Sequence, residues 1–476
     1  MSAVAQLLTL YDSARLVRAR ALSPVDLTRS CLERIERLDG QLNAFISVNG
    51  EEALDQAHSA ELELIRGDYR GSLHGIPIAL KDVVDVRGMP TTAASAAYGD
   101  RTPDRDAEVV RRLRAAGAVI LGKLNLHELA YGASSVVSAF GPVRNPWSRD
   151  HAAGGSSSGS AVAVATGMCY GAVGTDTGGS IRQPAAFCGV TGLKPTYGRV
   201  STRGVMPLSR SYDHVGPVAI SALDAALMLQ VMEGPDPDNP ARSNLSAPDY
   251  AGVLEDAEGL APGLRVGIPQ QHFFDSLDPE ISNALGSARG VLRQLGSIER
   301  EVVVPALTDT TLFQAETWAL HRERALRAPE LFQPETLRRL RAGGALDEAT
   351  RVEELRRLAN LRGSTGALFA DVDVIVTPTT VVLPFSVADT SGESHGLRVR
   401  ELVALQNTRP FNILGLPTIS IPCGFSAHGL PIGMQVTGAP GAETTVLQVA
   451  HAYQGVTRWH LCRPPVDQTP ASQPER

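Results

Sequence analysis

The sequence lacks any run of about 18 consecutive apolar residues, which is roughly the length that a membrane-spanning helix needs. Its first residues also carry no basic charge ahead of a short apolar run that Asp12 interrupts, and this is a poor pattern for a secretory signal. These two absences predict a cytoplasmic protein that does not cross a membrane.

Cysteine is scarce, and its spacing disfavours several kinds of site. The five cysteines are odd in number, and no two of them stand at the spacing of a metal-ligand pair or a redox motif. We therefore expect reduced, mostly buried thiols in a reducing compartment and no metal. The residues are Cys31, Cys169, Cys188, Cys423 and Cys462.

An excess of basic charge is also missing. The chain has 44 lysines and arginines against 51 aspartates and glutamates, a net charge of −7, so nothing suggests a surface that binds nucleic acid. An arginine-rich stretch over residues 322–362 is interleaved with acidic residues, which is typical of solvated helix faces. Aromatic residues make up only 5% of the chain, which disfavours a broad aromatic pocket.

The apolar residues that are present indicate alternating helices and strands. Helical spacing covers residues 24–38, 51–66 and 106–116, and buried-strand patterns cover residues 76–80 and 118–121. Further strand candidates are residues 264–268, 302–304, 373–376, 418–421 and 432–436. Because strands and helices alternate, we expect an α/β fold in which helices pack on a sheet with parallel pairs.

No internal segment is long or polar enough to divide the chain. We therefore predict one large domain over residues 1–463. The remaining residues, 464–476, are rich in proline, glutamine and serine, which predicts a disordered tail.

Two glycine- and serine-rich segments stand out, GGSSSGS at residues 154–160 and GTDTGGSIRQP at residues 174–184. Neither has the lysine followed by serine or threonine that a phosphate-binding loop needs. Residues 155–159 match the G-x-S-x-G pattern of a nucleophile elbow, with His214 as the base, but a loop rather than a strand precedes them. On composition alone, both segments can equally be tight turns with packing glycines.

A serine–lysine arrangement fits these segments better. A serine hydroxyl is a weak nucleophile until a base removes its proton, and a neutral lysine can be that base. Burial lowers the pKa of a lysine because it disfavours the ammonium form. Lys81 ends the apolar run 76–80 and is therefore the lysine that we expect to be buried.

These residues resemble the amidase-signature family over about residues 5–455. The segments that carry the resemblance are GIPIALKD at 75–82, GGSS at 154–157, DTGGSIR at 176–182, GLKPTYG at 192–198, PFN at 410–412 and GLP at 415–417. The two serines, Ser156 and Ser180, are 24 positions apart, as in the family. One departure is Ser158, where many members have glycine.

The resemblance implies a mixed, twisted sheet flanked by helices on both faces, and an amidase with a Ser-Ser-Lys triad. Ser180 would attack the carbonyl carbon, and Ser156, after a cis peptide bond, would relay the proton to Lys81. The backbone N–H groups of Thr177, Gly178, Gly179 and Ser180 would form the oxyanion hole. Asp176, Arg182 and Ser157 would support the loop, and neither metal nor cofactor would be needed.

The resemblance also bears on the substrate, a small-molecule amide or ureide. Residues 124–138 and 313–361 would line the acyl pocket, with Tyr131, Gly132, Trp318 and His321 as candidate contacts. For Tyr131, Trp318 and His321, a place in the core or on the surface is the competing interpretation. The leading alternative is the glutaminase component of a tRNA-dependent amidotransferase, but residues 310–370 contain nothing like that group's Tyr-Asp-Gly-x-Arg-Tyr-Gly segment. A stand-alone amidase, in a homodimer as many members are, is the preferred interpretation. A non-catalytic scaffold is disfavoured because all three triad residues are present.

Overall fold

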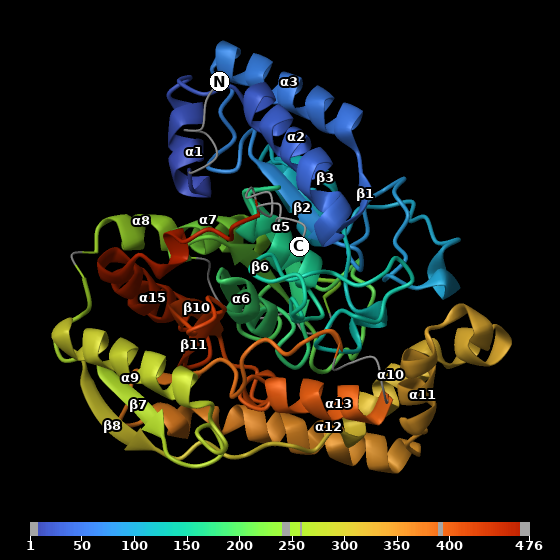
Figure 1. The fold of residues 1–476 in the computed structure, drawn as a ribbon, viewed down its shortest axis with the longest axis vertical. Helices are drawn as coiled ribbons and strands as arrows, with labels where there is room; N and C mark the ends of the chain where they lie inside the picture. Colours follow the sequence, from blue (N-terminus) through green and yellow to red (C-terminus); the bar gives the residue numbers. More distant parts are fainter. Residues whose placement is uncertain (1–7, 240–247, 258, 389–393, 467–476) are drawn as a thin grey trace, which may run out of the picture.

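A computed structural model of the protein describes residues 8–239, 248–257, 259–388 and 394–466 (Figure 1). Its core is an eleven-stranded sheet within these residues, in the order β1-β3-β2-β4-β6-β5-β10-β11-β9-β7-β8. The strands β2, β3 and β4 run parallel, as do β7, β8 and β9, and the other neighbouring pairs are antiparallel. The predicted α/β fold with a mixed sheet is confirmed.

The strands are short. Their bounds are β1 Phe45–Val48, β2 Pro77–Lys81, β3 Val119–Leu124, β4 Gly171–Asp176, β5 Thr191–Lys194, β6 His214–Ala219, β7 Arg265–Pro269, β8 Ile298–Val302, β9 Val374–Pro378, β10 Thr418–Phe425 and β11 Pro431–Gly438.

Helices cover both faces of the sheet. Those on one face are α2 Pro24–Leu42, α3 Gly50–Arg66, α5 Ser158–Ala165 and α6 Arg182–Cys188. Those on the other are α1 Leu10–Arg18, α4 Glu108–Ala115, α7 Ala222–Met232, α8 Tyr250–Glu255, α9 Pro279–Gln294 and α15 Glu443–Thr457. A group at the lower right of Figure 1 comprises α10 Thr311–Arg327, α11 Pro334–Ala342, α12 Glu348–Gly363 and α13 Ser394–Ala404, and α14 Arg409–Ile413 follows it in sequence.

Strand β2 shows how the sequence directs side chains to the two faces. Ile78 and Leu80 belong to the hydrophobic cluster with α4 and α7, whereas Ala79 belongs to the cluster with α5. Side chains alternate along a strand, so Lys81 points to the α5 face. Helix α5 consists of alanine, valine, serine and glycine, all buried, and such small residues let it pack closely against β2 and β4.

The sequence prediction missed or misplaced part of the sheet. The candidate at 302–304 is wrong, because β8 lies at Ile298–Val302 and Val303 is 86% exposed. This edge strand is charged and half-exposed, so it lacks the apolar signature of a buried strand. The sequence analysis did not predict β1, β4, β5 and β6; the last three are short, and glycine interrupts each of them.

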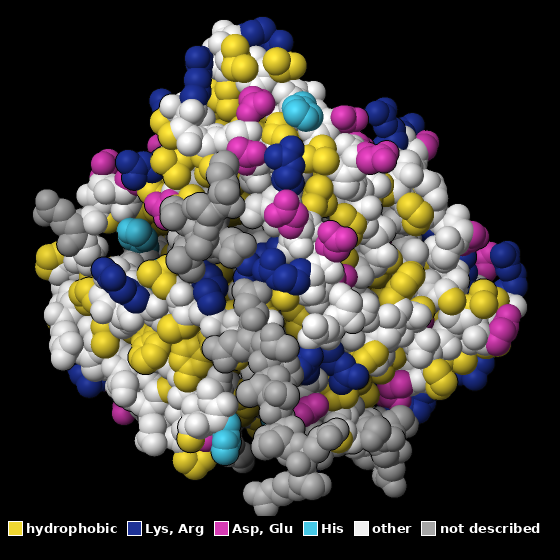
Figure 2. All heavy atoms as spheres, turned by 45° about the horizontal axis from the view of Figure 1, so that its top comes forward, with side chains coloured by type: hydrophobic (Ala, Val, Ile, Leu, Met, Phe, Trp, Pro, Cys, Tyr) yellow, Lys and Arg dark blue, Asp and Glu magenta, His cyan; other side chains and the backbone are white. Residues whose placement is uncertain are grey.

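Several other expectations can be compared with the described residues. All five cysteines are free, and four of them are buried. Along α12, three arginines of the basic stretch pair with acidic residues three positions earlier, in Arg351–Glu348, Arg356–Glu353 and Arg357–Glu354. On the face in Figure 2, basic side chains are interspersed with acidic and apolar ones.

No helix within the described residues is long and apolar enough to span a membrane. The boundary between domain and tail stays a prediction, and most of the predicted tail, residues 467–476, lies outside the described residues.

Candidate active site

Lys81 lies fully buried at the end of β2, beneath the N-terminal end of α5. Its Nζ is 2.7 Å from Ser156 Oγ, 2.9 Å from Ser157 Oγ and 2.7 Å from Thr175 Oγ1. Burial lowers the pKa of Lys81 to about 7, although the carboxylates of Asp176 and Asp213 oppose this shift. In a substantial fraction of the molecules, Lys81 is therefore neutral near pH 7 and can accept a proton.

The hydrogen bonds of Ser157 indicate which group can give that proton. Ser157 Oγ donates its only hydrogen to the carbonyl of Thr175 at 3.0 Å and accepts from the backbone N–H of Thr175 at 3.2 Å. Lys81 must then donate to Ser157, since this hydroxyl has no second hydrogen to give. A neutral lysine has two hydrogens and one lone pair, so the lone pair is left for a hydroxyl such as that of Ser156.

Backbone contacts hold Ser156 in place. The Gly155–Ser156 peptide bond is cis, as the resemblance implies. The Gly155 N–H donates to Gln183 Oε1 at 2.7 Å, and the Ser156 carbonyl accepts from the His127 N–H at 3.2 Å. Gln183 comes from α6, so the two glycine-rich segments are tied together directly at this point.

The second segment is a loop between β4 and α6 that carries Ser180. Asp176, the last residue of β4, accepts hydrogen bonds from the N–H groups of Gly179, Ile181 and Arg182. Its carboxylate also pairs with the buried Arg182 guanidinium, with Nε 3.0 Å from Oδ2. Burial alone would raise the pKa of Asp176, but the Arg182 charge lowers it strongly, so the carboxylate stays ionised.

A distant segment completes the support of this loop. Asn412 Nδ2, from α14, donates to Asp176 Oδ1 at 2.7 Å, and its Oδ1 accepts from Arg182 at 2.6 Å. Thr408 Oγ1 donates to the Gly178 carbonyl at 2.7 Å. Gly179 has a φ of +137°, and a Cβ there would lie 2.1 Å from Thr408 Oγ1. Only glycine fits this turn, because a side chain would collide and the backbone would be strained.

The four N–H groups predicted for the oxyanion hole differ in their contacts. The Gly179 N–H is already bound to Asp176 at 2.7 Å. For the N–H groups of Thr177, Gly178 and Ser180, no acceptor occurs among the residues that the structure describes. The same three residues line a cavity, and Gly179 does not. We therefore reduce the predicted set of four donors to these three.

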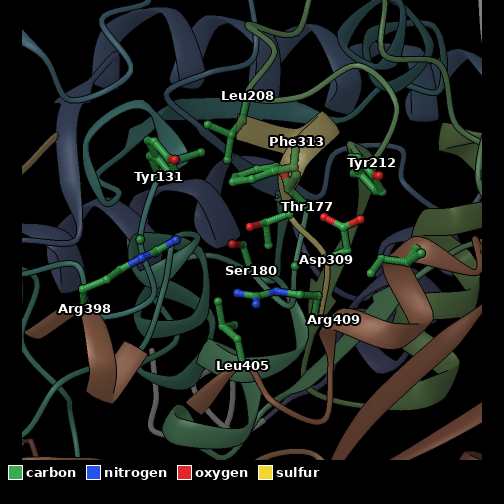
Figure 3. Close-up of a pocket in the computed structure, with 15 residues that line it drawn as sticks. Tyr131, Thr177, Ser180, Leu208, Tyr212, Asp309, Phe313, Arg398, Leu405 and Arg409 are labelled. Atoms are coloured by element: carbon green, nitrogen blue, oxygen red, sulfur yellow. The ribbon is translucent and has the colours of Figure 1, made fainter. Parts of the chain in front are cut away.

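This cavity opens beside Ser180 (Figure 3). Much of its wall is apolar or aromatic, formed by Tyr131, Leu208, Tyr212, Phe313, Leu405 and Ile413. Arg398, Arg409 and Asp309 bring charged groups to it. The space can therefore hold a substrate with an apolar body and a polar part near Ser180.

Two of the four predicted substrate contacts, Tyr131 and Gly132, line the cavity, whereas Trp318 and His321 do not. The assignment of Trp318 and His321 to this cavity is therefore corrected. His321 is buried, with Nδ1 2.7 Å from the Tyr98 hydroxyl, and burial lowers its pKa to about 4. Trp318 packs against the main hydrophobic cluster.

The elbow alternative finds no support in the geometry. His214 Nδ1 lies 2.7 Å from the Tyr212 carbonyl and 3.1 Å from the Asp176 carbonyl, on strand β6. The hydroxyl of Ser157, which this alternative makes the nucleophile, contacts Lys81 and Thr175 instead. In this geometry Ser157 is a hydrogen-bond partner of Lys81.

Sequence reasoning assigned no role to several residues of the site, among them Thr175, Gln183, Arg398 and Arg409. Thr175 and Gln183 lie inside the glycine-rich segments, so their positions were a usable signal. Arg398 and Arg409 lie in the last quarter of the chain, and no local pattern connects them with Ser180.

The Amidase family model matches residues 26–447. The chain belongs to the amidase family. The chain is 36% identical to the A component of the glutamyl-tRNA(Gln) amidotransferase of Moorella thermoacetica, over 96% of this chain and 98% of that protein. It is also similar to two solved structures.

One of these structures is described as an unexpected vestigial protein complex that reveals the evolutionary origins of an s-triazine catabolic enzyme. The identity is 33% and the TM-score 0.87, over 94% of this chain and 99% of that one. The other is the peptide amidase from Stenotrophomonas maltophilia, at 32% identity and a TM-score of 0.83, over 97% and 99%. The protein is thus placed among amidase-family enzymes, which act on C–N bonds.

Proposed function

We propose that the protein is a stand-alone amidohydrolase that cleaves a carboxamide or ureide C–N bond through Ser180, Ser156 and Lys81. The observation that carries the proposal is the buried Lys81 amine, which has three hydroxyl partners and a pKa of about 7. An amine in this state is a base at neutral pH. The Ser156 hydroxyl contacts this amine, and the cis-linked segment that carries Ser156 packs on the Ser180 loop.

In the first half of the reaction, Ser180 Oγ forms a bond to the carbonyl carbon of the substrate. Its proton passes to Ser156 Oγ, while the proton of Ser156 passes to the neutral Nζ of Lys81. When the tetrahedral intermediate collapses, the C–N bond breaks, and the proton returns from Lys81 through Ser156 to the leaving nitrogen. Ammonia or an amine departs, and an ester on Ser180 remains.

In the second half, water replaces the amine. Lys81 again accepts a proton through Ser156, this time from the attacking water, and Ser180 leaves as the alcohol when the proton returns. A carboxylic acid is released, and all three side chains are restored to their initial state. The negative oxygen of each intermediate would accept from the free N–H groups of Thr177, Gly178 and Ser180, where one donor is worth about 3 kcal/mol.

The test is covalent labelling with a fluorophosphonate probe, read by intact mass and peptide mapping. We expect a single adduct on Ser180 that is absent in Ser180→Ala and slower to form in Lys81→Ala. An adduct on Ser157 would restore the elbow alternative. If Ser180 is labelled, amide and ureide libraries can be screened for released amine.

The glutaminase component of a tRNA-dependent amidotransferase is the second candidate, and the similarity to the Moorella protein favours it. The two candidates differ in what activates the site. We expect amide hydrolysis by the chain alone, as a homodimer or a monomer. Glutaminase activity that appears only after candidate partner proteins are added would reverse the order of the two candidates.

A further inference from the structure

Arg409 is a charged side chain at the cavity that has no partner of opposite charge among the described residues. It lies at the start of α14, and its guanidinium points into the cavity beside Ser180 in Figure 3. Its Nε is 3.9 Å from the place that a Cβ on Gly178 would occupy. Within the described part of the chain, no residue forms a hydrogen bond or an ion pair with this guanidinium. Burial, followed by the nearby Arg398 charge, lowers the pKa of Arg409 to about 10.

Other arginines in the interior are paired. Arg182 is bound to Asp176, Arg199 to Glu233 and Arg339 to Glu335. Arg362, which is partly buried like Arg409, donates to the carbonyls of Ile413 and Ser211. A charge that is partly removed from water gains stability when a counter-ion joins it. Arg409, which is partly buried, therefore offers an unpaired cation to a ligand in the cavity.

A second arginine at the cavity, Arg398, is only partly neutralised. Its guanidinium is 3.8 Å from Glu401, and it lies 5.6 Å from the centre of the Tyr131 ring. Glu401 has a closer partner, Arg339, at 2.8 Å. Figure 3 shows the ends of Arg398 and Arg409 pointing into the same cavity from opposite sides. Both cations therefore face the space that a substrate would fill.

The acidic residue of the cavity does not balance these charges. Asp309 pairs with the exposed Arg357 and accepts from the Thr311 N–H at 2.9 Å. The rest of the lining is largely apolar and aromatic, so a ligand has to bring the missing negative charge.

We infer that Arg409, with Arg398, forms a carboxylate-binding subsite, and that the substrate is an amide bearing a carboxylate near the scissile bond. This inference rests on the proposed amidase function of Ser180 and names its substrate class. The carboxylate is on the acyl part, as in the half-amide of a dicarboxylic acid, or on the amine part, as in an N-acyl amino acid. The planar guanidinium suits both, because it binds carboxylates with two parallel hydrogen bonds.

Matched pairs of substrates test this inference and separate the two positions. For the acyl side, glutaramate is compared with 5-methylhexanamide, in which an isopropyl group replaces the carboxylate. For the amine side, N-benzoylglycine is compared with N-isobutylbenzamide. We expect kcat/KM for one charged substrate to exceed that of its neutral match by about 10- to 100-fold, the usual range for a charge-assisted hydrogen bond.

Variants show whether Arg409 causes the preference. In Arg409→Met, the preference should fall to about one, because KM rises for the charged substrate much more than for its neutral match. Arg409→Lys should restore part of it. Arg356→Met is the control. This exposed arginine pairs with Glu353 on α12, and its replacement also removes one positive charge. A preference that is missing in the wild type, or that survives in Arg409→Met, overturns the inference.

A binding measurement separates this inference from the amidase proposal. Glutarate and N-benzoylglycine are titrated by calorimetry into Ser180→Ala, which cannot turn over a substrate by the proposed route. Binding that weakens by about tenfold or more when Arg409→Met is added supports the subsite even if no amide is cleaved. If neither compound binds, or if the variant binds equally well, the subsite is refuted while labelling of Ser180 still decides the proposed function.

Discussion

Two buried lysines at the ends of neighbouring strands have opposite surroundings. Among the described residues, the Lys81 amine of β2 forms hydrogen bonds only with hydroxyl groups, those of Ser156, Ser157 and Thr175. Lys123 of β3 pairs with the Asp82 carboxylate at 2.7 Å and also contacts Thr91 Oγ1 at 3.0 Å. Both lysines are fully buried.

The contrast shows how one fold gives a lysine two different roles. Burial lowers the pKa of Lys123 as well, but the Asp82 carboxylate beside it favours the ammonium form. For Lys81, the hydroxyl groups offer no charge, and the carboxylates of Asp176 and Asp213 do not offset the burial. Lys123 is thus a structural cation, whereas Lys81 is suited to exchange protons.

The largest effect is expected from Lys81→Met, which keeps the length and removes the amine. If the proposed mechanism holds, kcat should fall by about 10⁴-fold or more, in the range seen when a member of a catalytic triad is lost. The melting temperature should change little, because a buried amine is replaced by an apolar group of similar size. Activity assays and thermal unfolding of the same preparation check both. Activity near that of the wild type would refute the role of Lys81.

Lys123→Met should instead lower the stability of the fold and leave the pH dependence of catalysis unchanged. It leaves the Asp82 carboxylate buried without its cation, and this should lower the free energy of unfolding by about 3–5 kcal/mol. Denaturant titration measures the loss. In the protein that remains folded at low temperature, the pH dependence of kcat/KM should match the wild type. A shift of that profile would show that Lys123 takes part in setting the Lys81 base.

The pH dependence follows from the lowered pKa of Lys81. Protonation destroys the base, so kcat/KM should decrease about tenfold per pH unit below about 7 and become flat above it. The unfolded chain holds the lysine proton up to about pH 10.4, whereas the folded chain releases it near pH 7. Stability relative to Lys81→Met should therefore rise with pH between these values. A pH–rate profile and unfolding at several pH values test this.

The smallest effect in the comparison is expected from single hydroxyl partners. Thr175→Val removes one partner of Lys81, and a hydrogen bond of about 1 kcal/mol corresponds to roughly a fivefold loss of kcat/KM. Thr91→Val removes a partner of Lys123 and should cost stability of similar size without changing the rate. Equal effects of both variants on kcat/KM would remove the distinction between the two lysines.

The sequence went furthest where function is encoded in contiguous residues. The motifs around Lys81, Ser156 and Ser180 named the candidate triad, and the alternation of apolar segments predicted the α/β fold. Prediction from the sequence failed where the local pattern does not match the tertiary environment of the residues. Glycine interrupts the strands β4 to β6, and Trp318 and His321, which the sequence offered only as candidate contacts, pack elsewhere.

By itself, then, the sequence determined the family, the fold class and the residues proposed for the chemistry, because the motifs are short runs of neighbouring positions and the alternation of apolar segments can be followed along the chain. Only the tertiary structure decided the partners of each group. Lys81 meets Thr175 across 94 positions, and Asp176 meets Asn412 across 236. The packing of distant segments sets burial and charge balance, and these physical quantities distinguish the base Lys81 from the cation Lys123 and leave Arg409 without a partner among the described residues.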